Sequence, residues 1–364
     1  MAGGTFIKAI VLIVVSVMVF GFCSSSVVHN LIWDNVKELT GDEGNGSESF
    51  YTYPETATYN LTQSITLIPS SGNISDFVYR TPVPMDAWND QSVQYVNHIG
   101  PGSVWNVNLD VDKSSVPDWV YIYHNDSFSE TLSFSIDYNF TSEFKIWNIT
   151  VEESADVSAI PSWYNDTYVR DQEWKAEGTD VGINRSAASV AVDEAFNGSE
   201  TNVLEILHKA FIWTGEIAYS TTGSRLKSVT ETIADRTGDC DDVSTLLISM
   251  VRAKGVAAWL EQGVLYKSST DSWEHHAWVQ AYVPLMNGSY VNITIDPVNN
   301  QFALFSPDRL IVYTDISGDE TLMQNYYNYI GYSYHTLPAL MSSLTNNYMQ
   351  SSGTVQVPIS HMTW

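Results

Sequence analysis

The sequence is poor in cysteine and in basic residues. Cysteine occurs only at Cys23 and Cys240 among 364 residues, and Cys23 borders an apolar run, so we expect no internal disulfide. Exported domains normally use cysteine in pairs, so the solitary Cys240 is a buried apolar residue, an intermolecular crosslink or a reactive thiol. Lys and Arg total 16 against 42 Asp and Glu, for a net charge of -26. This imbalance excludes nucleic-acid partners and electrostatic docking on anionic lipid.

Long apolar runs are also scarce, apart from residues 6–23, which only Lys8 interrupts. This run is at the short end of what spans a bilayer. No small-residue cleavage site follows Phe22, so we favour an uncleaved N-terminal helix that anchors the chain in the cell membrane over a signal peptide. The Met1 amine and Lys8 lie at the N-terminal end of the run and Asp34 and Glu38 follow it, so the positive-inside tendency places the C-terminal domains outside the cell.

After residue 23, the spacing of apolar residues changes several times along the chain, and each change marks a different predicted element. Residues 132–140 alternate apolar and polar, as a half-buried strand does, and residues 59–68 and 144–151 behave similarly. Helical spacing predicts helices at 203–218 and 241–254, and strands are predicted at 257–266, 276–283 and 290–295. We therefore predict five regions: an anchor (1–28), a stalk (29–58), a β-sandwich (59–158), an α+β catalytic domain (159–320) and a tyrosine-rich extension (321–364).

Three residues of the α+β region have the chemistry of nucleophilic thiol catalysis. Cys240 begins a predicted helix, where free N–H groups and the helix dipole favour a thiolate. His276 begins one predicted strand and Asp296 ends the next, so a short hairpin would place the carboxylate beside the imidazole. Asp239 and Asp241 flank the thiol and oppose its ionisation, so a base is required.

These residues lie in RTGDCDDVSTLLISMVRAKGVAAWL, HHAWVQAYVP and ITIDPVN. The three segments resemble, in order, the Cys, His-Ala-Trp-Val and Asp-Pro motifs of the transglutaminase-like superfamily, over about residues 160–315. The resemblance implies a papain-like fold, with Cys240 as nucleophile, His276 as general base and acid, and Asp296 as the group that orients His276. It also implies chemistry at amide bonds, either hydrolysis of peptide or isopeptide bonds or transfer of a glutamine acyl group to an amine. We expect a surface protein or peptide as the substrate, and no cofactor or metal.

Other interpretations of these residues were weighed. Cys240 alone would more often be a small buried residue, and His275 is a rival base, although strand alternation points it away from the face of His276. A metal site formed by Cys240, His275, His276 and Asp242 lacks the spacing of known zinc motifs. The leading hypothesis is a cysteine peptidase or amidase acting on cell-envelope proteins, the alternatives being a crosslinking transglutaminase and a non-enzymatic surface or filament subunit.

The sequence is rich in N-x-S/T sequons, for which chance would supply roughly five. Their excess predicts a surface glycoprotein, which agrees with the expected topology. The candidate glycosylation sites are Asn45, Asn60, Asn73, Asn125, Asn139, Asn148, Asn165, Asn184, Asn197, Asn287 and Asn292.

Overall fold

The computed structural model describes residues 50–69, 75–82, 91–99, 108–109, 119–124, 129–174, 178–221, 226–267, 270–314, 328–333 and 339–358. Within these ranges no helix is both long and apolar enough to cross a membrane. The predicted anchor, most of the stalk and the sequons at Asn45, Asn73 and Asn125 lie outside the described residues.

An antiparallel five-stranded sheet forms the centre of the α+β part, in the order β16-β15-β14-β13-β18. All three predicted strands are present, although β14 begins earlier than predicted. Gly288, with a φ of +84°, lies in the turn between β14 and β15 and takes a conformation that glycine adopts without cost. The bounds are β13 Ala258–Lys267, β14 Ser272–Pro284, β15 Tyr290–Asp296, β16 Gln301–Phe302 and β18 Arg309–Thr314.

The two predicted helices are confirmed as α5 (Val203–Gly215) and α7 (Cys240–Ala253). Asn202 caps α5, because its side chain accepts a hydrogen bond from the Glu205 N–H, and Gly255, with a φ of +85°, follows the end of α7. The smaller elements around them are η1 Val157–Ala159, α3 Ser162–Tyr168, β9 Gln172–Trp174, β10 Gly178–Ile183, α4 Ser189–Ala195, β11 Ala218–Tyr219, α6 Val229–Asp235 and β12 Thr237–Gly238.

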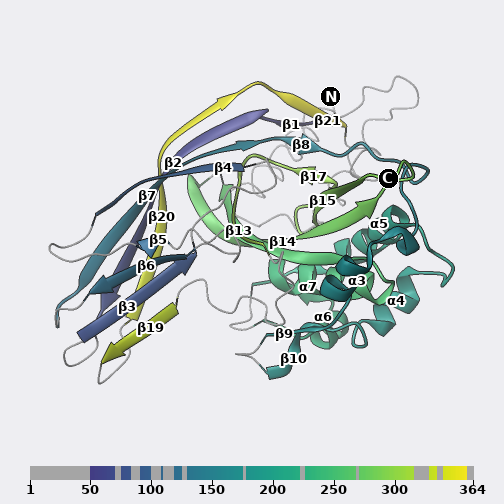
Figure 1. Cartoon of the computed structure of the whole chain (residues 1–364), viewed down its shortest axis with the longest axis horizontal. Coiled ribbons are helices and arrows are strands. Elements are labelled where there is room, and N and C mark those ends of the chain that lie inside the picture. Colours follow the sequence, from purple (N-terminus) through teal and green to yellow (C-terminus); the bar gives the residue numbers. More distant parts are fainter. Residues whose placement is uncertain are drawn as a thin grey trace, which may run out of the picture.

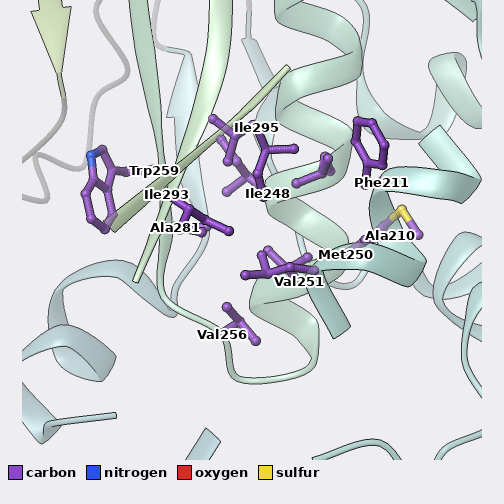
Figure 2. Packing of buried hydrophobic residues seen from close by; sticks show 14 of the residues in the cluster. Ala210, Phe211, Ile248, Met250, Val251, Val256, Trp259, Ala281, Ile293 and Ile295 are labelled. Atoms are coloured by element: carbon purple, nitrogen blue, oxygen red, sulfur yellow. The ribbon is translucent and has the colours of Figure 1, made fainter. Parts of the chain in front are cut away.

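Helix α7 is buried on nearly all sides, which is why its polar residues need partners inside the protein. Ser244 Oγ donates to the carbonyl of Ala277 in β14, and Ser249 Oγ donates to the carbonyl of Thr245. Ile248 and Met250 of α7 lie among side chains from α5 and from the central sheet (Figure 2). This dense packing fixes the N-terminus of α7 against the sheet.

The β-rich part contains two four-stranded sheets, in the orders β20-β2-β7-β4 and β19-β3-β6-β5. Figure 1 shows these strands at the end of the molecule away from the helices, with the five-stranded sheet between. The bounds are β2 Thr56–Ile68, β3 Ser75–Pro82, β4 Gln91–Ile99, β5 Asn108–Leu109, β6 Trp119–His124, β7 Leu132–Glu143, β19 Asn328–Ser333 and β20 Ala339–Ser352.

The C-terminal segment is part of these sheets, whereas the sequence analysis placed it outside the predicted β-sandwich. Strand β20 pairs with β2 along its whole length, and β21 (Val355–Pro358) pairs with β1 (Phe50–Tyr53). Half of the residues of β20 are Ser, Thr or Asn, and its apolar residues do not alternate regularly with them, so it lacks the pattern that reveals a strand. The strand predicted at 144–151 was wrong beyond β8 (Lys145–Ile146), which pairs with β17 (Leu304–Phe305).

The β-rich part packs directly on the central sheet. Ala57, Tyr59 and Leu61, on one face of β2, form a buried cluster with residues of β13 and β18, among them Val264 and Leu310. Tyr59 stacks on Phe140 of β7 with ring centroids 4.7 Å apart. Strands β13 and β18 therefore both contact the β-rich part.

Candidate active site

Cys240 is the first residue of α7 and is partly buried. Asp239 caps the helix: its side chain accepts from the Asp242 N–H, and the Asp242 carboxylate accepts from the Asp239 N–H at 3.2 Å. This reciprocal arrangement secures the helix start, where unpaired backbone N–H groups and the helix dipole favour a developing negative charge.

The sulfur of Cys240 lies against β14, at the peptide that follows His276. The backbone N–H of Ala277 donates to the sulfur, while the carbonyl of the same residue accepts from Ser244 Oγ at 3.2 Å. Both polar groups of the Ala277 backbone are thus bonded to the first turns of α7. These contacts bring the cysteine beside the strand that carries the histidine.

His276 and Asp296 form a buried pair across neighbouring strands. His276 Nε2 lies 2.8 Å from Asp296 Oδ2, and the two side chains are 8% and 0% exposed. Asn299 Nδ2 lies 2.9 Å from the same ring nitrogen and donates to Asp296 Oδ2 at 2.7 Å. Since an ionised carboxylate only accepts, the contact with Asp296 places a proton on Nε2, and the lone pair of a neutral ring then lies on Nδ1.

Asp296 is an ionised carboxylate without access to water. Burial alone would raise its pKa, but the charges of His276 and Arg309 outweigh burial and hold the pKa of Asp296 below its ordinary range. Its Oδ2 accepts from Arg309 Nη2 at 2.5 Å, and its Oδ1 accepts from the Asn299 N–H at 3.0 Å. The site therefore contains a permanent negative charge that can stabilise a protonated imidazole.

Negative charge also surrounds the thiol. Burial raises the pKa of the Cys240 thiol above its ordinary value, the charges of Asp241 and Asp239 raise it further, and the Ala277 N–H lowers it. A thiol in this environment does not ionise by itself at neutral pH. Attack by its sulfur therefore requires a base that removes the proton, which is the role that the free Nδ1 of His276 can fill.

Asp239, Asp241 and Asp242 have side-chain oxygens within 4.8 Å of one another. Burial and the neighbouring Asp241 raise the pKa of Asp239 to about 7, while burial and the charge of Asp239 raise the pKa of Asp242 to about 6. These are the oxygens in the described part of the chain that could share a cation. They already bond to the helix start and, through Asp242 Oδ1, to the Lys227 N–H at 2.7 Å.

The metal set considered from the sequence, Cys240 with His275, His276 and Asp242, is not brought together as such a group within the described residues. His276 instead pairs with Asp296. His275 is exposed at the surface, because successive residues of a strand point to opposite faces.

Replacing Asp241 with asparagine is expected to lower the pKa of Cys240, because the variant removes the charge that disfavours the thiolate most. The pH at which alkylation of Cys240 by iodoacetamide is half-maximal should fall, by about half a unit to one unit. Glu205→Gln is the matched control, since Glu205 lies in the first turn of α5 and its loss should leave the profile of Cys240 unchanged. An unchanged profile in Asp241→Asn would contradict the electrostatic explanation.

The comparisons with known proteins agree with this geometry. Residues 190–295 match the family profile of the Transglutaminase-like superfamily, so this segment is a transglutaminase-like domain. Such a domain, with its mixed α and β content, supports an enzyme of the cysteine hydrolase or transglutaminase type. Cys240 and His276 lie inside the matched range, and Asp296 directly follows it.

Solved structures give weaker likenesses. A candidate cysteine protease from Cytophaga hutchinsonii is 12% identical, with a TM-score of 0.48 and coverage of 85% of this chain and 93% of that one. Legionella pneumophila LapG is 17% identical, with a TM-score of 0.28 and coverage of 44% and 84%. No curated protein matches the sequence.

Sequence reasoning missed two residues that contact Asp296. Asn299 belongs to the ITIDPVN segment, and its N–H donates to the carboxylate of Asp296 three residues earlier, in the turn that follows β15. The Asp-Pro pair was a signal for this turn. Arg309 lies on a different strand, and nothing in its local sequence distinguishes it from a surface arginine.

Proposed function

We propose that this chain is a membrane-anchored extracellular cysteine peptidase or amidase that acts on cell-envelope proteins. Cys240 is the nucleophile, and His276 is the general base and acid. Asp296 orients His276 and stabilises its protonated form. The observation that carries the proposal is the buried His276–Asp296 pair at 2.8 Å, with the Cys240 sulfur held at the peptide next to His276.

In the first half-reaction, His276 Nδ1 removes the proton of the Cys240 thiol as the sulfur attacks the carbonyl carbon of the substrate amide. The carbonyl oxygen becomes an oxyanion, toward which the backbone N–H of Cys240 at the start of α7 can donate. The C–N bond then breaks, and the imidazolium of His276 gives its proton to the leaving amine. The products are a free amine and a thioester on Cys240.

In the second half-reaction, His276 removes a proton from a water molecule that attacks the thioester carbonyl. The C–S bond breaks, a carboxylic acid leaves, and the proton returns to the sulfur. An amine in place of water would give a new amide, which is the outcome in the alternative, a crosslinking transglutaminase. Asp296 stays ionised throughout and stabilises the imidazolium.

The membrane and surface location rest on the sequence. The apolar run at residues 6–23 precedes the described residues, and the sequon excess favours an exterior location. Asn148, Asn197 and Asn287 are exposed and available for a glycan. By contrast, Asn60 Nδ2 donates to Asn139 Oδ1 at 2.6 Å across paired strands. A glycan on Asn60 would be attached to this same nitrogen, so its attachment competes with the hydrogen bond.

Thiol alkylation of the ectodomain tests the proposal. Iodoacetamide should label Cys240 with a pH-dependent rate, and His276→Ala should reduce the rate at pH 7 by about 100-fold, because general-base assistance is worth about 10²–10⁴. His275→Ala is the matched control, since it removes the adjacent ring without touching Asp296. Labelling that does not depend on His276 would favour a non-enzymatic surface or filament subunit.

A glutamine-containing peptide offered with a labelled primary amine separates the two enzyme types. A hydrolase releases ammonia or a cleaved peptide without incorporating the amine, whereas a transglutaminase forms the labelled amide. Both activities should vanish in Cys240→Ala, which serves as the blank for each. Amine incorporation that exceeds hydrolysis would overturn the peptidase or amidase assignment in favour of crosslinking.

A further inference from the structure

Arg309, the first residue of β18, is a fully buried cation in contact with the candidate active site. Its side chain is 0% exposed, and Nη2 lies 2.5 Å from Asp296 Oδ2, which is also 0% exposed. The same nitrogen donates to the side-chain oxygen of Gln301, and the guanidinium lies 5.2 Å from the ring centroid of Trp278. A buried charge is costly unless paired, so these contacts determine where the guanidinium lies.

The charge balance of the site explains what this pair does. Arg309 is a buried cation, and its charge acts together with that of His276 to favour the ionised form of Asp296 against burial. Removal of Arg309 takes away one of the charges that oppose the effect of desolvation on the Asp296 carboxylate. A neutral carboxyl group could not stabilise the imidazolium that forms when His276 takes the thiol proton.

The position of Arg309 is secured from the β-rich part of the protein. Gln301 Nε2 donates to the hydroxyl of Tyr53 in β1 at 3.3 Å, and the Gln301 carbonyl oxygen accepts from Arg309. Asp308, the neighbouring carboxylate, accepts from Ser306 Oγ. Nη2 at the end of the guanidinium thus bridges Gln301 and Asp296. Lysine lacks the planar group that carries this nitrogen and lies near the ring of Trp278.

We propose that Arg309 is a positioning residue of the catalytic site. It holds Asp296 ionised and oriented toward His276 Nε2, and it does so from a strand that packs against the β-rich part. This role rests on the proposed function, because it matters only if Cys240 reacts with the help of His276.

The test is the pH profile of Cys240 alkylation in the ectodomain variant Arg309→Lys, which keeps the charge but replaces the guanidinium whose Nη2 bonds both Asp296 and Gln301. We expect the alkylation rate at pH 7 to fall about tenfold and the midpoint of the pH profile to rise by about one unit. The reason is that a less well-oriented Asp296 stabilises the imidazolium less, so the thiolate forms less readily beside it. Gln301→Met, which leaves Arg309 in place, should shift the midpoint in the same direction by less. If Arg309→Lys fails to fold, the pH profile of Gln301→Met tests the proposal in its place.

The decisive measurement is the double variant Arg309→Lys with Asp296→Asn. If Arg309 acts through Asp296, the double variant should label no more slowly than Asp296→Asn alone, since interacting sites are not additive. Arg252→Lys is the matched control: Arg252 is 1% exposed and donates to the carbonyls of Ala258 and Arg170. Its loss should lower the melting temperature without moving the profile.

Two outcomes would overturn the proposal. A wild-type profile in folded Arg309→Lys, or effects of Arg309→Lys and Asp296→Asn that simply add, would show that the arginine is only a structural ion pair. These results would leave the proposed function intact if wild-type labelling still depends on His276. Labelling of the wild-type protein that is independent of His276 would overturn both.

Discussion

Asp296→Asn is expected to destabilise the folded protein by about 3–5 kcal/mol, the usual cost of removing one partner of a buried ion pair. The variant leaves Arg309 buried without its counter-charge, since both side chains are 0% exposed. It also removes the charge that stabilises protonated His276, so alkylation of Cys240 at pH 7 should slow about tenfold or more. Urea denaturation and the alkylation rate measure the two effects.

The same residue predicts a dependence of stability on pH. The pKa of Asp296 is lower in the folded protein than in the unfolded chain, where it is about 3.9. The stability from its ionised form is therefore fully present above about pH 4 and is lost as the pH falls toward the folded-state pKa. Asp296→Asn should lose less stability than the wild type on acidification through this range. Parallel acid profiles for the two proteins would contradict the assignment of Asp296 as a paired carboxylate.

Like Asp296→Asn, the substitution Gly263→Ala is expected to destabilise the folded protein strongly. A Cβ at this position would lie 2.0 Å from the carbonyl oxygen of Leu310 and 2.9 Å from the ring of Trp278. Gly263 pairs with His276 on one side and with Ile311 of β18 on the other. An added methyl group must therefore push β18, and Arg309 with it, away from the site, at a cost of about 1–3 kcal/mol or more.

The melting temperature and the alkylation rate of Gly263→Ala should both fall. Gly215→Ala is the matched control, because Gly215 ends α5 and a Cβ there meets nothing within 4 Å. This control should be neutral or slightly stabilising. Wild-type stability in Gly263→Ala would mean that β18 does not approach β13 as closely as described.

The sequence by itself determined the local parts of the site. Helix α7 was predicted because Val243, Leu246, Leu247 and their neighbours recur at helical spacing before Gly255, and all lie in the buried core. The hairpin that carries His276 and Asp296 was predicted from short apolar strands around Asn287-Gly288. These signals are local, because a period or a turn residue is set by the covalent neighbours of each position.

Only the tertiary structure decided which distant residues complete the site and the sheets. Arg309 bonds Asp296 because β18 pairs with β13, and β20 pairs with β2 although its polar sequence gives no strand signal. The tautomer of His276 and the raised pKa values of Asp239 and Asp242 also depend on burial and on neighbours in space. Burial and pairing between distant segments arise only when the chain folds, so no local pattern in the sequence encodes them.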